Sequence, residues 1–164
     1  MRPGEGGFSL LAWEGLDERE RAEFLAVREY RPPRAFSGWS NGVELLGYRI
    51  WGGQGDQNLT LDTAWHVREV PPEGVDYHWT HQLFSAGGQR VWQQDAVGLA
   101  ASSWRAGDLV MTTFSAPLAL EARPGLYSMR VGIYTYPEIK TVPVVDQSGQ
   151  PIAAYVELGP VDIR

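Results

Sequence analysis

The stretch from Arg123 to Tyr134 reads RPGLYSMRVGIY, and its alternation decides the fold. After a Pro-Gly turn, apolar side chains recur at every second position, at Tyr127, Met129, Val131 and Ile133. A period of two with β-branched and aromatic residues predicts a strand that buries one face. A tyrosine at the entrance of such a strand is typical of the tyrosine corner of immunoglobulin-like sandwiches. The stretch predicts a fold and carries no signature of a reaction.

Short strands of the same kind repeat after Pro33, separated by turns rich in glycine and proline. The expected strands are Val43–Trp51, Asn58–Val67, Tyr77–Ala86, Gln89–Gln94, Asp108–Ala116, Gly125–Thr135, Thr141–Asp146 and Pro151–Ile163. Many short strands with regular turns and no long helix favour an all-β protein. We therefore predict an immunoglobulin-like or fibronectin-like β-sandwich over residues 36–164, with a jelly roll as the alternative topology.

Alternation within three of these strands indicates which side chains fill the core between two sheets. The expected inward residues are Leu59, Leu61, Thr63, Trp65 and Val67; Tyr77, Trp79, His81 and Leu83; and Val110, Thr112, Phe114 and Ala116. A chain of 164 residues buries enough surface to be stable without disulfides, which agrees with the absence of cysteine.

Residues 1–35 are richer in charge than the rest of the chain and lack its repeated short strands. They are expected to form an N-terminal arm or linker. Asp17 and Glu20 match a capping box, with aspartate in place of serine or threonine, and predict a short helix over residues 17–30. Phe24, Leu25 and Val27 would form its apolar patch. The alternative is an extended arm over residues 24–30 that lies across the sandwich.

Charge and hydropathy exclude several classes of partner. Fourteen Lys and Arg oppose twenty Asp and Glu, which gives a formal net charge of −6. An acidic chain without a basic stripe argues against nucleic acid as a partner. The longest apolar run, Phe8 to Trp13, is too short to span a bilayer, and no signal-peptide pattern opens the chain. No motif for a cofactor stands out, since the glycines at 52–55 lack the Lys-Ser/Thr of a phosphate loop.

The titratable residues do not form a catalytic or metal-binding pattern. The three histidines are His66, His78 and His81, and positions i and i+3 of a strand face opposite sides, so the last two cannot share a metal. Asp95 and Asp108 stand at a strand end and in a turn, where aspartate accepts local backbone hydrogen bonds. No Gly-x-Ser-x-Gly elbow occurs. We predict no catalytic residue and no metal.

The seven tryptophans are the best lead to a binding function. Trp65 and Trp79 are expected in the core. Trp51 ends a strand beside a glycine loop, and Trp92 should face outward if Val91 faces inward. An exposed aromatic face can stack on a sugar ring, and the predicted ligand-binding residues are therefore Trp51, Trp92, Gln94 and Asp95. A protein or membrane-surface contact is the competing interpretation of the same residues.

Several short motifs resemble one known family over about residues 36–164. They are LLGY at 45–48, LTLDTAW at 59–65, DY at 76–77, LFSAGG at 83–88, VWQQD at 91–95, WRAGD at 104–108, PGLY at 124–127, VGIY at 131–134 and VVD at 144–146. Together they resemble the soluble C-terminal β-sandwich domain of bacterial, Chloroflexi-type, glycosyltransferase-like polytopic membrane proteins. The resemblance implies a domain on the extracytoplasmic side of the cell membrane, beside a transferase whose chemistry lies in the transmembrane part.

The function that follows from these expectations is non-catalytic. We predict an accessory domain that contacts an envelope glycan or a lipid-linked sugar and packs on an intrachain membrane region or a protein partner. The alternative is a structural or protein–protein interaction module without carbohydrate binding, for which a homodimer stays open.

Overall fold

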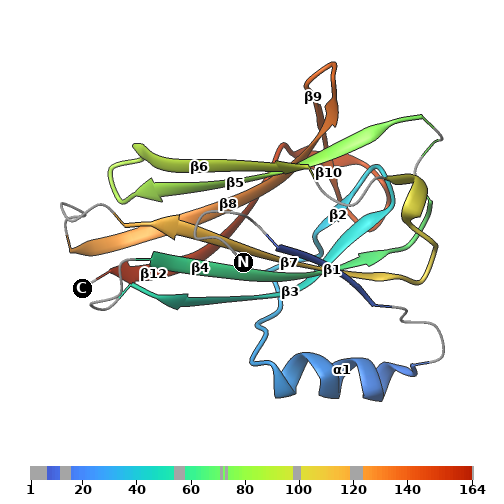
Figure 1. Cartoon of the computed structure of the whole chain (residues 1–164), viewed down its shortest axis with the longest axis horizontal. Helices are drawn as coiled ribbons and strands as arrows, with labels where there is room; N and C mark the ends of the chain where they lie inside the picture. The colour runs from blue at the N-terminus through green and yellow to red at the C-terminus, as the bar shows by residue number, and fades with distance from the viewer. Residues whose placement is uncertain are drawn as a thin grey trace.

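The computed structural model describes residues 7–11, 16–53, 58–70, 72, 74–97, 101–118 and 124–163. Two antiparallel sheets face each other in it (Figure 1). Sheet A has seven strands in the order β1-β7-β4-β3-β2-β10-β11, and sheet B has the path β12-β8-β5-β6, with β9 paired to β8. The strands are β1 (Gly7–Leu11), β2 (Gly38–Trp39), β3 (Val43–Gly52), β4 (Asn58–Val67), β5 (Asp76–Ser85), β6 (Arg90–Val97), β7 (Leu109–Pro117), β8 (Gly125–Tyr136), β9 (Lys140–Val142), β10 (Val144–Val145), β11 (Pro151–Ala153) and β12 (Val156–Ile163). The predicted all-β sandwich is confirmed.

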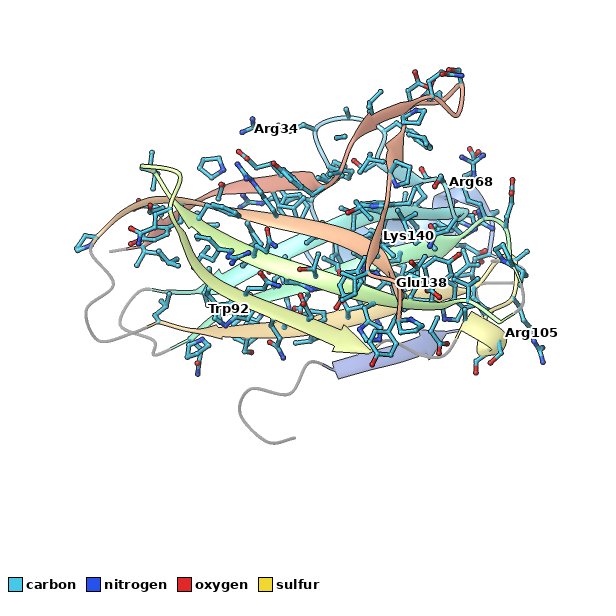
Figure 2. All side chains as sticks on the ribbon, turned by 90° about the horizontal axis from the view of Figure 1, so that it is seen from above. Arg34, Arg68, Trp92, Arg105, Glu138 and Lys140 are labelled. Carbon is cyan, nitrogen blue, oxygen red and sulfur yellow. The ribbon has the colours of Figure 1, made fainter. Side chains whose placement is uncertain are left out.

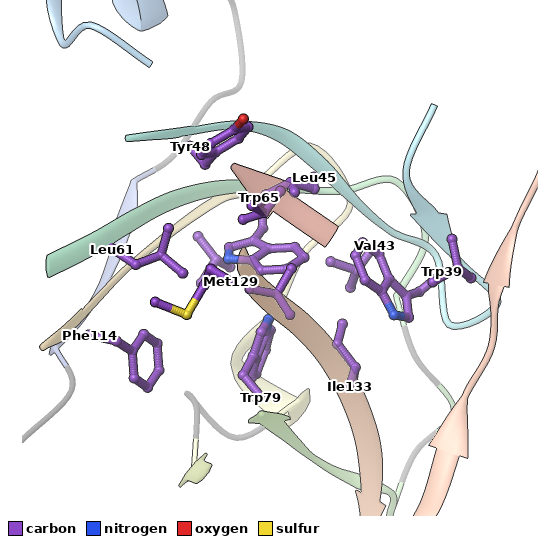
Figure 3. Close-up of a cluster of buried hydrophobic side chains, with 14 of the residues drawn as sticks. Trp39, Val43, Leu45, Tyr48, Leu61, Trp65, Trp79, Phe114, Met129 and Ile133 are labelled. Carbon is purple, nitrogen blue, oxygen red and sulfur yellow. The ribbon is translucent and has the colours of Figure 1, made fainter. Parts of the chain in front are cut away.

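The core lies between the sheets and consists of the side chains that the alternation predicts. All thirteen expected inward residues of β4, β5 and β7 are buried, and so are Tyr127, Met129, Val131 and Ile133 of β8. A line of indole rings crosses this core: the Trp39 and Trp65 centroids lie 5.2 Å apart, and those of Trp65 and Trp79 lie 6.2 Å apart (Figure 3). Edge-to-face pairs of this kind each add about 0.5–1.5 kcal/mol beyond burial alone.

Two expected strands are each divided between the sheets. Residues 141–146 form β9 on sheet B and β10 on sheet A, with Pro143 between them. Proline has no N–H to donate to a ladder, so pairing is interrupted there. Residues 151–163 likewise form β11 on sheet A and β12 on sheet B. The predictions of one continuous strand in each place were wrong.

A β-bulge in β3 changes which side chains of this strand face outward. Leu45 pairs with Trp65, whereas Gly47 pairs with Ala64, so one extra residue stands on β3 between these pairs. A bulge of this kind shifts the alternation by one position. Beyond it, Tyr48 and Ile50 belong to the core, while Arg49 and Trp51 lie on the outer face of sheet A.

The predicted helix is present and is shorter than expected. Helix α1 spans Glu18–Val27, and Asp17 and Glu20 form the reciprocal capping box. The helix packs on the outer face of sheet A, where Phe24 and Leu25 contact the cluster around Ala64 and Leu109. Val27 is 74% exposed, so its assignment to the apolar patch was wrong.

The residues before α1 also contribute to the sandwich, since β1 pairs antiparallel with β7 at one edge of sheet A. Residues 1–6 and 12–15, which belong to the expected arm, lie outside the described residues. The division of the chain at residue 36 stays a prediction.

Candidate functional site

The four residues predicted to bind a ligand lie on three different surfaces. Trp51 is on the outer face of sheet A and is 51% exposed. On β6 of sheet B, Trp92 pairs with Leu83 and Gln94 pairs with His81, so both belong to the inner face. Asp95 pairs with Thr80 and is exposed on the outer face of sheet B. The structure therefore does not bring these four residues into one site.

Trp92 faces the core, whereas the sequence predicted that it would face outward if Val91 faced inward. Val91 is 48% exposed, and Trp92 packs against the core (Figure 2). Trp92 faces inward because it pairs with the core residue Leu83. A register shift lies on the other side of Val91, since Phe84 pairs with Arg90 and Val91 is the extra residue. Trp92 lines a cavity of about 740 Å³ at the end of the sandwich, together with Leu118 and Leu126.

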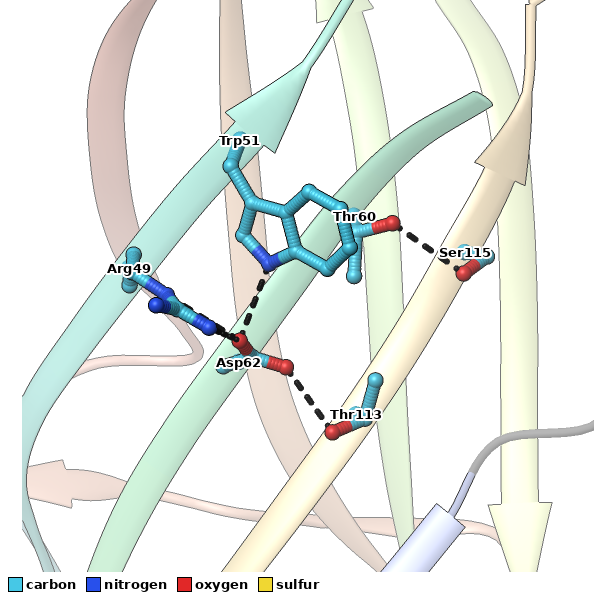
Figure 4. A network of polar contacts seen from close by, with 6 residues as sticks. All are labelled: Arg49, Trp51, Thr60, Asp62, Thr113 and Ser115. Atoms are coloured by element: carbon cyan, nitrogen blue, oxygen red, sulfur yellow. Dashed lines mark hydrogen bonds and ion pairs between the residues drawn. The ribbon is translucent and has the colours of Figure 1, made fainter. Parts of the chain in front are cut away.

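Trp51 is held by a buried carboxylate (Figure 4). Its indole Nε1 donates a hydrogen bond of 2.9 Å to Oδ2 of Asp62, and the Arg49 guanidinium lies 2.8 Å from the same oxygen. Thr113 donates to the other carboxylate oxygen at 2.8 Å. The hydrogen bond to Asp62 raises the pKa of Arg49. Both carboxylate oxygens of Asp62 thus accept hydrogen bonds, and one of them orients the exposed indole ring of Trp51.

A hollow on the outer face of sheet B combines aromatic and polar side chains. It has a volume of about 220 Å³. Its lining is formed chiefly by Thr80, Gln82, Arg130, Gly132, Tyr134, Thr141, Ala154 and Tyr155, and we call it the Gly132 hollow. A Cβ atom on Gly132 would lie 3.3 Å from Cγ2 of Thr80 and 3.4 Å from the Ala154 carbonyl oxygen. The absence of a side chain at Gly132 therefore lets Thr80 and the backbone of Ala154 approach β8 closely at the floor of the hollow.

Arg130 forms one wall of the Gly132 hollow and is held from several sides. Its guanidinium carbon lies 4.1 Å from the ring centroid of Phe84 and 4.7 Å from that of Tyr155. Nε donates to Glu157 at 3.2 Å, and Nη1 donates to the Tyr155 hydroxyl at 3.3 Å. A second hollow of about 300 Å³, with Phe84 and Ser128 in its lining, lies on the other side of Arg130.

A chain of polar contacts runs beside the Gly132 hollow. Nδ1 of His78 lies 3.2 Å from the Tyr134 hydroxyl, and the imidazole stacks on Tyr136 at 4.5 Å. Burial raises the pKa of Tyr134, and so does its hydrogen bond to Asp95. Gln93 in turn donates to Asp95 at 3.0 Å. These contacts fix the rotamers of the polar side chains.

The histidines lie in three separate layers of the molecule. His66 is on the outer face of sheet A, His78 is on the outer face of sheet B, and His81 is in the core. Within the described residues no group of three metal-ligating side chains occurs. Asp108 has the expected turn role, since its carboxylate accepts from the backbone N–H of Arg105 at 2.8 Å. Asp95 lies on β6 of sheet B, whereas Asp108 lies in the turn before β7 of sheet A. The two carboxylates share no contact within the described region.

Sequence reasoning missed the residues that form the Gly132 hollow, although one signal was visible. Ser128, Arg130, Gly132 and Tyr134 alternate with the core residues of β8, so the sequence places them on one outer face. Tyr155 and Gln82 come from the residues before β12 and from β5, and only sheet topology shows that they meet β8 there.

Comparison with known proteins supports the architecture. No protein family and no curated protein matches this sequence. Among solved structures, the chain is similar to the C-terminal domain of Wzt, with a TM-score of 0.53 and 14% sequence identity over 80% of this chain and 84% of that one. At this identity the likeness shows the fold alone, a β-sandwich. It identifies no ligand, and it does not show membership of the glycosyltransferase-like family. No helix in the described part of the chain is long and apolar enough to cross a membrane.

Proposed function

We propose that this chain is a non-catalytic carbohydrate-binding domain whose site is the Gly132 hollow on sheet B. The observation that carries the proposal is the combination of two tyrosine walls, a glycine in the floor and fixed polar groups in one hollow. Tyr155 is 43% exposed there, so its ring offers a face to a ligand.

The chemistry of the hollow matches that of a sugar ring. Sugars present apolar C–H faces and hydroxyl edges, and tyrosine rings and amide side chains complement these two features. Gln82 donates to Gln93 at 3.3 Å and lines the hollow as well, so its amide is already oriented. A site with ordered side chains loses little conformational entropy when it binds.

The place of the domain in the cell is proposed from the motif resemblance. The chain would act on the extracytoplasmic side of the membrane, beside a glycosyltransferase-like membrane portion, and would hold an envelope glycan or a lipid-linked sugar. The similar solved structure is itself the C-terminal domain of a larger protein, which agrees with an accessory role.

Binding to a glycan panel, followed by calorimetry, tests the proposal. Tyr155→Ala removes the exposed wall and is expected to weaken binding about tenfold or more, since aromatic side chains often dominate recognition. Trp51→Ala is the matched control, because it removes a similarly exposed aromatic ring from the opposite sheet. Loss of binding in the Trp51 variant alone would place the site on sheet A and contradict the proposal.

A second candidate function is supported by Trp51 itself. An indole ring that is half exposed and locked by Asp62 is the kind of side chain that anchors a protein partner. The chain would then be an interaction module with sheet A as its contact face. Absence of glycan binding, together with self-association or partner binding that Trp51→Ala abolishes, would favour this function.

A further inference from the structure

We propose that the Gly132 hollow selects uncharged sugars over acidic ones, such as uronic acids. This inference rests on the proposed function, and it concerns the class of ligand that the site accepts. It is drawn from the charged groups around the hollow and from how each of them is already engaged.

Arg130 is the cation in the lining, and it is neutralised within the protein. Its Nε donates to Glu157 at 3.2 Å and its Nη1 donates to Tyr155 at 3.3 Å. The two aromatic rings of Phe84 and Tyr155 cover the guanidinium at 4.1 and 4.7 Å. A sugar carboxylate would have to displace Glu157 to pair with Arg130, so it would exchange one ion pair for another and gain nothing.

The next charge along the sheet is negative. Gly132, Thr80 and Asp95 stand in one row across β8, β5 and β6. At the usual spacing of strands, about 10 Å separates the backbones of Asp95 and Gly132, which is within reach of the carboxylate's field at moderate ionic strength. The Asp95 carboxylate also accepts a hydrogen bond from Tyr134, which lines the hollow. Asp95 therefore repels an anionic ligand and leaves a neutral one unaffected.

Within the described residues, the other two cations on the strands of sheet B are too far away or face elsewhere. Arg90 pairs with Phe84, four residues along the strands from the row of Thr80, which is roughly 13 Å. Lys140 precedes Thr141 on β9, and Thr141 lines the hollow, so alternation directs Lys140 to the other face. Neither cation offsets Asp95 at the hollow.

Paired neutral and acidic oligosaccharides test the inference. The probes are glucan and glucuronan, galactan and galacturonan, and mannan and mannuronan oligomers of equal length, titrated into the full chain by calorimetry. We expect the uronate of a binding pair to bind at least about threefold more weakly at low ionic strength. Equal or tighter binding of the uronates overturns the inference and leaves the proposed function standing. Failure of every oligomer to bind contradicts the proposed function, and the inference fails with it.

Substitution of Glu157 gives a reversal test. In Glu157→Gln, Arg130 loses its internal anion, and the affinity for the uronate is expected to rise about tenfold because a charge-assisted hydrogen bond becomes available. Asp76→Asn is the matched control, since it changes the net charge equally at an exposed position of the same sheet. An equal gain in both variants, or no gain in Glu157→Gln, contradicts the role of the Arg130–Glu157 pair.

Discussion

His81 makes the fold sensitive to acid, and its replacement should remove that sensitivity. The imidazole is completely buried and stacks on Phe114 with ring centroids 3.5 Å apart. Neither ring nitrogen has a hydrogen-bond partner in the described part of the chain. Burial lowers the pKa of His81 from 6.5 to about 3, because a charged imidazolium would lose its hydration without compensation.

The sign of the effect follows from proton linkage. The unfolded chain binds a proton at this residue near pH 6.5, whereas the folded chain binds it only near pH 3. The free energy of unfolding is therefore highest above pH 6.5, and it declines as the pH falls from 6.5 toward about 3. Each pH unit within it costs up to about 1.4 kcal/mol, so that stability falls by about 2 kcal/mol between pH 7.5 and pH 5.

Urea unfolding of the wild-type chain and His81→Leu at these two pH values measures the difference. For an m-value near 2 kcal/mol/M, the wild-type midpoint should fall by about 1 M more than that of the variant. His66→Gln is the control, because His66 is only partly buried and should contribute less. An equal acid shift of the wild-type chain and the leucine variant would refute the reasoning.

Three further substitutions probe the hollow, the Asp62 network and the helix cap. Gly132→Ala places a methyl group 3.3 Å from Thr80 and should reduce glycan affinity about tenfold or more by calorimetry, with only a small change in melting temperature. Asp62→Ala removes a buried acceptor with three partner side chains and should cost about 3 kcal/mol in urea unfolding, with lower fluorescence anisotropy of Trp51. Asp17→Ala removes the N-cap of α1 and should cost about 1 kcal/mol or less, seen by circular dichroism as fraying of the helix. Unchanged affinity, stability or helicity, respectively, would contradict these expectations.

Alternation in the sequence predicted the core because strands β4, β5, β7 and β8 pair over most of their length in continuous register. The period of two is a local property, so burial could be assigned without knowing which strands are neighbours. The capping box of α1 is local as well and was correct at Asp17 and Glu20. Local signals therefore predicted the faces of these four strands and the start of the helix, but not the division of residues 141–146 and 151–163 between the sheets.

The candidate site was harder to predict because it depends on register and on neighbours distant in sequence. The direction of Trp92 follows from its pairing with the core residue Leu83, and the VWQQD motif alone does not indicate whether Val91 or Trp92 faces the core. The Gly132 hollow needs Tyr155 beside β8, and this contact follows from the pairing of β12 with β8. Gly132 permits the close approach of Thr80 and of the Ala154 carbonyl oxygen, and the sequence alone does not identify these neighbours.

The two outer faces of the sandwich differ in what covers them, and this difference favours sheet B as the binding face. On sheet A, α1 packs over Ala64 and Leu109, and Asp62 is saturated by its neighbours. On sheet B, Gly132, Tyr134 and Tyr155 line a hollow. The polar groups around it contact one another along the sheet surface, and the hydrophobic core lies on the opposite side of β8. Substitutions in the hollow should therefore change affinity far more than stability, whereas substitutions around Asp62 should do the reverse.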